Sequence, residues 1–396
     1  MSRCRHASTT ASRPSFGALL VEEPFRLFFP WAAVLGLVGV MLWPLFITGW
    51  LKFLPGLPHS RLMILGFGGG CVIGFLGTAG PRMLGASSLR PWETFGLWLC
   101  HAAAAFACLR LHDELSCALF GLSFMALLLC LARRFAVRTD MPPPGFVLVL
   151  LGLLSGIAGC LMFVFHLDWQ DAFNFRLARL LADEAFLLLP ILGVSGFLVP
   201  RILGLPSRHS FSDSRTPPSG WWPLALEALA AGLLILASLV IEAAGWISWG
   251  AGLRFCLILI WWARDLPGLW RVKTTGTQAW MLKVGLGFVA AAPLLLAIDF
   301  RRLIAMEHVL FITGFGLTMY AVAARVVFGH SGRTEEARGI SKPLRWVTWL
   351  AILAMSTRVS ADYVASIQNS HYFYAALTWV IITVIWLRVV WRGLWT

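Results

Sequence analysis

Charged residues are scarce in this chain, and acidic residues are the scarcest. Only 13% of the 396 residues are Asp, Glu, Lys or Arg, and only 19 are acidic. A soluble domain carries about 25% charged residues, because its surface must be hydrated. Hydrophobic residues reach 59% instead, with a mean hydropathy of +0.78. The composition therefore excludes a soluble globular protein and predicts an integral membrane protein.

Motifs of soluble enzymes and of cysteine metal sites are also missing. The chain has no GxxxxGK[ST] phosphate loop, no GxGxxG placed after a strand and no hydrolase nucleophile elbow. None of the eight cysteines forms a C-x-x-C pair, and most lie in apolar runs, so we expect buried thiols. The polar, basic N-terminus does not indicate a cleavable signal peptide. The residues leave open whether the protein catalyses any reaction.

The chain contains long apolar runs in place of soluble-enzyme motifs. A spanning helix needs about 20 apolar residues, and continuous runs of that size recur along the chain, unlike the alternating strands of a membrane barrel. We predict an all-α, polytopic membrane protein of about twelve transmembrane helices, forming a single integral membrane domain over 1–396 with its bundle at 28–393. The predicted spans are 28–50, 61–81, 92–111, 115–132, 145–167, 183–203, 221–242, 246–263, 278–298, 307–328, 344–363 and 371–393.

Lys and Arg residues gather on one side of this predicted bundle. That side receives both terminal segments and most of the cations, whereas Arg254, Lys283 and Arg358 fall within spans. By the positive-inside rule, both termini are cytoplasmic, together with the segment 1–27 and the loop 204–220. The net charge of +13 is then explained by orientation in a lipid bilayer, and no nucleic acid partner is expected.

The second, sixth and tenth spans end in similar sequences. These ends are GFLGTAGPRMLG (74–85), GVSGFLVPRILG (193–204) and AARVVFGH (323–330), in which Arg82, Arg201 and Arg325 precede Gly85, Gly204 and Gly329. Because these spans lie four apart, we predict three repeats of a four-helix unit, with the arginines as inner-face anchors. In the last copy, Gly329 is expected to end the helix, which leaves His330 on the cytoplasmic side.

Polar residues at the opposite ends of the same spans form the candidate site. Glu184 and His308 precede Arg201 and Arg325 by the same interval, and the second span begins near His59. The residues expected to meet at the outer face are His59, Met63, Asp183, Glu184, Glu307 and His308, with His112, His166 and His371 at nearby span ends. Imidazole is a common ligand of copper and haem iron, although an interfacial histidine can also be merely hydrogen-bonded.

Two polar residues lie deeper in the spans. Arg358 precedes Asp362 by four residues, which is the spacing of an ion pair on one helix. The alternative is that the guanidinium holds an anionic cofactor group such as a haem propionate. His101, within WLCHAAAAF, is predicted to be a hydrogen-bonded residue at a close helix contact.

Three blocks of the sequence resemble the NnrS family, the haem- and copper-containing membrane proteins linked to nitric oxide stress. The blocks are PFRLFF (24–29), PHSRLMILGF to GFLGTAGPRMLGA (58–86) and EHVLFITGFGLTMYAVAARVVFGHSGR (307–333). The resemblance implies twelve spans, haem and copper cofactors, and a role in nitrosative stress or denitrification in the bacterial inner membrane. It also implies nitric oxide as a ligand and a respiratory electron donor as a partner.

The chain departs from this family at one motif. Relatives read roughly H-A-H-E-M where this chain has His59-Ser60-Arg61-Leu62-Met63, so only the first histidine and the methionine match. This departure favours a single metal centre or an altered one.

Three functions remain open from the sequence. The first is a haem-binding, copper-binding protein with His59, His308 and Met63 as candidate ligands and Arg358, Glu307 and Glu184 around the cofactor. The second is a transporter of a small anion or metal complex without bound haem, in which Arg82, Arg201 and Arg325 line a cytoplasmic vestibule. The third is an assembly factor for respiratory complexes. No catalytic residue can be named.

Overall fold

The computed structural model describes residues 17, 20, 22–165 and 171–396. Within these ranges the chain is helical apart from its connections, and it has no strand there. Most of the segment 1–27 and His166 lie outside the described residues. The predicted all-α class is confirmed for the part that the structure covers.

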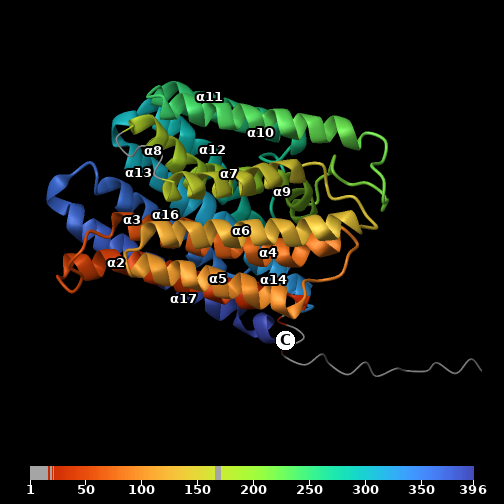
Figure 1. Ribbon diagram of the computed structural model, residues 1–396, viewed down its shortest axis with the longest axis horizontal. Coiled ribbons are helices and arrows are strands. Elements are labelled where there is room, and N and C mark those ends of the chain that lie inside the picture. The colour runs from red at the N-terminus through yellow and green to blue at the C-terminus, as the bar shows by residue number, and fades with distance from the viewer. Residues whose placement is uncertain (1–16, 18–19, 21, 166–170) are drawn as a thin grey trace, which may run out of the picture.

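Each predicted span coincides with one long helical segment, and these segments run roughly parallel along the long axis (Figure 1). Three of them are continuous rods of three elements each. The bounds are α2 (Phe25–Ile47), α3–η1–α4 (Gly56–Met83), α5 (Pro91–Leu109), α6 (Asp113–Ala136), α7 (Phe146–Val164), α8–η2–α9 (Ala172–Leu203), α10 (Trp221–Ala243), α11 (Ile247–Asp265), α12 (Thr277–Ile298), α13–η4–α14 (Leu303–His330), α16 (Lys342–Ser360) and α17 (Gln368–Trp395), with the short elements η3 (Phe300–Arg302), α15 (Thr334–Arg338) and η5 (Ala365–Ile367) between them.

Nine helical segments in the described ranges are long and apolar enough to cross a membrane. The three remaining long helices, α5, α11 and α16, have 19 residues each and are more polar. Two of them carry arginines within the helix, Arg254 in α11 and Arg358 in α16. The protein is therefore a multi-pass helical membrane protein.

Many consecutive helices pack on one another, and the last helix packs on the first. Along the chain, α5 packs on α6, α6 on α7, α10 on α11, α11 on α12, and α16 on α17. The last helix, α17, then packs on the first, α2, which closes the arrangement. The three compound rods each pack on the long helix that precedes them, namely α2, α7 and α12.

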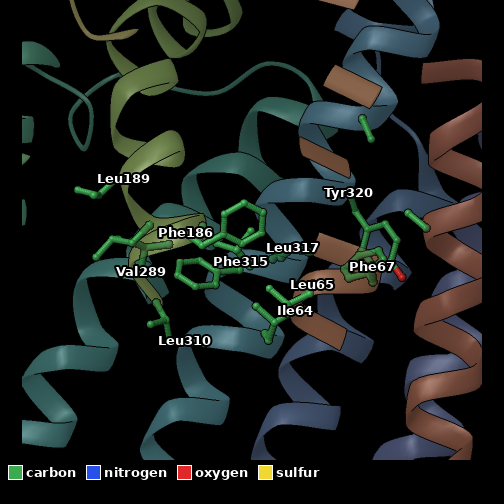
Figure 2. Close-up of a cluster of buried hydrophobic side chains, with 14 of the residues drawn as sticks. Ile64, Leu65, Phe67, Phe186, Leu189, Val289, Leu310, Phe315, Leu317 and Tyr320 are labelled. Atoms are coloured by element: carbon green, nitrogen blue, oxygen red, sulfur yellow. The ribbon is translucent and has the colours of Figure 1, made fainter. Parts of the chain in front are cut away.

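Each compound rod contains one π-helical turn. These turns are η1 (Leu62–Gly68), η2 (Leu180–Ala185) and η4 (Val309–Gly316). Figure 2 shows Leu65, Phe186 and Phe315, from or next to the three turns, within one buried cluster. We call this cluster, with Phe67 and Leu310, the apolar plug. π-helical turns are rare and often lie near functional sites. The position of the plug therefore indicates the part of the bundle in which a functional site is expected.

The three rods also end alike, at what we call the arginine end of the bundle, which carries Arg82 and Arg201. Each rod is followed by a left-handed glycine, with φ of +56° at Gly85, +70° at Gly204 and +71° at Gly332. After each glycine, a backbone N–H donates to the carbonyl five residues earlier at 2.9 Å, from Ala86, Leu205 and Arg333. This is the geometry of a Schellman motif, in which glycine carries no penalty.

Two predictions about the tenth span were wrong, namely that Gly329 ends its helix and that Arg325 is the positional counterpart of Arg82 and Arg201. The helix α14 continues to His330, so Gly329 does not end it, and the left-handed residue is Gly332. Arg82 and Arg201 precede their terminal glycines by three residues, whereas Arg325 precedes Gly332 by seven. Arg325 therefore lies about one turn farther from the helix end than its supposed counterparts.

A buried arginine ties the two ends of the chain together. Arg26, at the start of α2, is 2% exposed and binds Glu23 at 2.6 Å. It also donates to the carbonyl oxygens of Gly393 and Leu394, at 3.1 and 2.8 Å, where α17 leaves them without helical partners. The contact reinforces the packing of α17 on α2.

We expect Arg26→Met to lower the free energy of unfolding by about 2–3 kcal/mol, because charge-assisted hydrogen bonds to buried groups are lost. Thermal unfolding in detergent measures the effect. Arg388→Met, which changes an exposed arginine of α17, is the control. Equal melting temperatures for the two variants would contradict the assigned role.

Candidate functional site

His59 and His308 meet at the end of the bundle opposite the arginines, which we call the histidine end. His59 comes from α3 and His308 from the last position of α13, and each directly precedes a π-helical turn or lies within three residues of one. Their ring centres are 6.4 Å apart, and the ring planes differ by only 11°. The structure thus brings together the two histidines that the sequence pattern paired.

Backbone carbonyls fix the orientation of both rings. The Nδ1 atom of His59 lies 2.9 Å from the Gly39 oxygen, and that of His308 lies 2.7 Å from the Ile304 oxygen. A carbonyl can only accept, so each Nδ1 carries the proton and each Nε2 keeps its lone pair. Neither Nε2 has a hydrogen bond in the described part of the chain. A neutral imidazole held by a carbonyl in this way is the usual state of a metal-ligating histidine.

Met63 lies beside Gly39, whose carbonyl holds His59. A Cβ atom added at Gly39 would be 3.1 Å from the Met63 sulfur, so the glycine makes the space that the methionine fills. Met63 follows His59 by four residues on one rod, which places both on the same face.

Aromatic rings and one ion pair form the wall next to His59. The Trp43 ring lies 6.3 Å from His59 and 5.0 Å from Tyr372, between ring centres. Arg358 lies 4.3 Å above the Tyr372 ring and donates to Asp362 at 2.8 Å. The ion pair suggested by the spacing of Arg358 and Asp362 is present. It does not test whether the guanidinium also holds an anionic cofactor group.

Glu307 and Glu184 form separate ion contacts at the same end. Glu307 binds Arg179 of α8 at 2.6 Å, and Glu184 binds Arg254 of α11 at 2.6 Å. The sequence placed these acids at the histidine end but gave them no arginine partners. Partners two or four spans away leave no periodic signal in a sequence.

Arg61 is the centre of another buried contact. Its side chain is 1% exposed and lies 3.2 Å from Asp113 and 3.7 Å from Asp183. The guanidinium also lies 3.9 Å from the centre of the Phe163 ring, which is a cation–π contact. Arg61 therefore joins α3 to α6 and η2 and offers no donor to a metal.

The contact around Arg254 contains two carboxylates and only one guanidinium. Arg254 is the partner of both Glu184 and Glu242, at 2.6 and 2.7 Å, and all three side chains are at most 4% exposed. A single guanidinium balances a single carboxylate, so full ionisation would leave one uncompensated charge in a buried site. Arg179 and Glu307, which lie close by, pair with each other.

The remaining described histidines are engaged in hydrogen bonds or lie apart. His101 accepts from Trp31 at 3.1 Å and donates to the Leu65 carbonyl of η1 at 3.0 Å, as predicted for a hydrogen-bonded residue. His209, in the loop 204–220, donates to Asp265 at 2.7 Å and is 3% exposed. Sequence analysis missed this buried pair, because a polar loop gave no sign of burial.

His330 lies at the arginine end in a cluster around Glu23. The Glu23 carboxylate lies 2.6 Å from His330 Nδ1 and 2.8 Å from Arg82. Burial alone would raise the pKa of Glu23, but the hydrogen bonds from His330, Arg82 and Arg26 lower it to about 2. The second predicted anchor, Arg201, stacks on Phe197 at 3.6 Å. His330 therefore does not share a site with His308.

In the described ranges, no group of three or more His, Cys, Asp and Glu side chains is placed to hold a metal ion. The candidate site is thus a pair of imidazoles with a neighbouring thioether. A metal bound there must obtain its other donors from elsewhere.

The fold and this pair define a multi-pass helical membrane protein with a candidate metal-binding histidine pair at one end of its bundle. A family model described as NnrS protein matches residues 19–396. The chain therefore belongs to the NnrS family. A comparison with curated proteins found no match.

The surplus carboxylate around Arg254 leads to a prediction about stability. Arg254→Met leaves two buried acids without a cation, which costs about 3–5 kcal/mol and is comparable to the whole stability of many domains. Glu184→Gln keeps the pair of Arg254 with Glu242 and removes the surplus charge, so we expect a change below about 1 kcal/mol. The yield and melting temperature of each purified variant are compared with those of the wild type. Similar losses of stability in both variants would contradict the charge argument.

The low pKa of Glu23 predicts how stability depends on pH. Because the folded-state pKa of about 2 lies below the ordinary 4.5, the stabilisation is complete above pH 4.5 and is lost as pH falls toward 2. Glu23→Gln should therefore destabilise the protein by about 2 kcal/mol at neutral pH and progressively less in acid. The difference in unfolding free energy between the wild type and the variant is measured from pH 7 downward, with the exposed Glu22→Gln as control. A difference independent of pH would count against the assignment.

Proposed function

We propose that this chain is a haem-binding protein of the bacterial inner membrane that acts in the response to nitric oxide, with His59 and His308 as the two iron ligands. The observation that carries the proposal is the parallel pair of imidazoles, 6.4 Å between ring centres, with both Nε2 atoms without a hydrogen bond. Membership of the NnrS family supplies the link to nitric oxide.

The spacing of the rings fits one metal ion between them. A metal–imidazole nitrogen bond is about 2.0–2.1 Å, so two imidazoles on opposite sides of one ion have nitrogen atoms about 4 Å apart. For Nε2 atoms that face one another, the ring centres lie farther apart by one ring radius on each side, and the observed 6.4 Å is compatible with that arrangement.

The small number of protein donors favours haem over a copper ion. Haem iron already has four ring nitrogens and requires only axial ligands from the protein, whereas a protein copper site uses three or more side chains. When bound, haem would supply a redox-active iron, and a diatomic ligand such as nitric oxide would have to displace one of the two imidazoles, because both would be iron ligands. Copper held by His59, His308 and Met63 is the second candidate, because a thioether is a soft donor next to the pair.

The residues around the pair have roles that do not depend on the metal. The Gly39 and Ile304 carbonyls hold the rings in the tautomer that a metal requires. Arg358 places a positive charge next to Tyr372 and His59, where it would attract the carboxylates of a haem. Glu307 and Glu184 hold α13 and η2 in place through their arginines instead of contacting the cofactor.

We further propose twelve spans in three four-helix units, with both termini in the cytoplasm. Three π-helical turns, three glycine-ended rods and the return of α17 to α2 support the repeat. The excess of cations at the arginine end supports the orientation. Nitric oxide would then meet the histidine end from the outer side, and a respiratory electron donor is the partner that a redox role requires.

Absorption spectra of detergent-purified protein, oxidised and reduced with dithionite, test the proposal together with metal analysis. We expect a Soret band, stoichiometric iron, and a spectral change on addition of nitric oxide. Iron content should fall at least tenfold in both His59→Ala and His308→Ala, because each removes an axial ligand. His371→Ala, at the same end but bonded to Ser360 at 2.8 Å, is the matched control.

Two results would contradict the proposal. Haem that remains fully bound in the double variant of His59 and His308 would place the ligands elsewhere. Copper with no iron, lost with Met63→Leu, would favour the second candidate.

A further inference from the structure

An open groove along α12 contains Lys283, the third cation that the sequence places within a span. Arg254 and Arg358 bind carboxylates at 2.7 and 2.8 Å, whereas Lys283 binds none in the part of the chain that the structure describes. Its ammonium donates instead to the carbonyl oxygens of Val272 at 2.9 Å and Trp270 at 3.5 Å. An ammonium has three N–H donors, so one remains for another acceptor. The protein does not neutralise this charge.

The connection that holds Lys283 adds more positive charge. Segment 266–276 joins α11 to α12, reads LPGLWRVKTTG and carries two exposed cations, Arg271 and Lys273, with no acidic residue. The residues that line the groove also include no acid. This is the arginine end of the bundle, because the first N–H of α12, from Thr277, donates to the Gly339 carbonyl just after α15. The groove is therefore cationic at the arginine end and attracts an anion there.

Farther along α12 the groove becomes apolar. Its lining continues through Val284, Gly287, Phe288 and Ala291, all partly exposed. Spacings of three and four residues place them on one face of the helix. From Lys283 to Ala291 the helix rises roughly 12 Å, which is close to half of the roughly 30 Å hydrocarbon core. The groove thus has the polarity and the length of a phospholipid in one leaflet, with charge at the end of the bundle and apolar surface toward its middle.

Tryptophan rings line the same groove. A Cβ atom added at Gly287 would be 3.7 Å from the Trp270 ring, so this ring lies over the glycine. The Trp280 ring lies 5.8 Å from that of Trp349 in α16, between ring centres. Trp270 and Trp349 are 51% and 57% exposed. Exposed tryptophans are typical of the level at which lipid headgroups meet the hydrocarbon, and this is the level of the Lys283 ammonium.

We propose that this groove binds one anionic phospholipid, with its phosphate against Lys283 and an acyl chain along Val284, Gly287 and Ala291. Basic pockets at the ends of membrane helices bind anionic headgroups in this way. A zwitterionic lipid is disfavoured, because its own cation would lie next to Lys283, Arg271 and Lys273. A soluble anion is disfavoured, because it would leave the apolar half of the groove empty. The inference goes beyond the proposed function and does not rest on it, since it uses neither the histidine pair nor a cofactor.

Native mass spectrometry of the full-length protein tests the proposal. The protein is released from nanodiscs that contain equal amounts of phosphatidylglycerol and phosphatidylcholine, and the lipids that remain bound are identified. We expect the wild type to retain phosphatidylglycerol in preference to phosphatidylcholine. Retention should fall about fivefold in Lys283→Met, which removes one cation at the headgroup level. Arg388→Met, which removes an exposed arginine at a similar depth on α17, is the matched control and should retain as much as the wild type.

Gly287→Leu tests the apolar half of the groove without changing any charge. The 3.7 Å to the Trp270 ring leaves room for a Cβ atom, so we expect the variant to fold, and the larger side chain then occupies the path of the acyl chain. Phosphatidylglycerol retention should fall in this variant as it does in Lys283→Met. Melting temperatures in lipid-free detergent show that each variant is folded, and Gly287→Leu decides the matter if Lys283→Met is not.

Three results would overturn the proposal. The first is equal retention of the two lipids by the wild type. The second is unchanged phosphatidylglycerol retention in both groove variants. The third is a loss in Lys283→Met with full retention in Gly287→Leu, because the acyl chain would then lie outside the groove.

Discussion

The rest of the structure depends on three arginines at the histidine end, of which Arg61 and Arg254 are buried and Arg179 is partly buried. A guanidinium keeps its charge at any accessible pH, and the bilayer interior offers no water to solvate it. Each arginine must therefore meet a carboxylate, and in every case that carboxylate comes from another helix. Arg61 meets Asp183, Arg179 meets Glu307, and Arg254 meets Glu184.

These pairs connect the rods that carry the candidate site. Arg61 ties α3 to η2, and Arg179 ties α8 to α13, so the two rods that bear His59 and His308 are both anchored to the α8–η2–α9 rod. The histidines then need only carbonyl contacts to complete their orientation. The same network buries Arg61 against Asp113 and Asp183, so this arginine holds α3 to α6 and η2.

Much of the fold was predictable, because the length of each apolar run can be read directly from the sequence. The pairing of His59 with His308 was predicted because both histidines lie at the same end of spans that were matched as repeats. The partners of the buried arginines were not predictable, because an arginine gives no indication of which of several acids it meets. The displaced position of Arg325 was not predictable either, since π-helical turns of 7, 6 and 8 residues shift each rod differently and have no sequence signature.

The rods define two levels of the bundle interior. The oriented imidazoles lie at the histidine end, and the apolar plug lies at the π-helical turns. The plug therefore places buried hydrophobic side chains between the histidine pair and the Glu23 cluster at the arginine end.

The measurement that tests the central claim most directly is an electron cryo-microscopy map of the protein purified from cells grown with ample haem and copper. We predict density for a flat macrocycle between His59 and His308, with iron bonded to both Nε2 atoms. Well-defined imidazoles with no density between them, in a preparation that contains haem, would contradict the account.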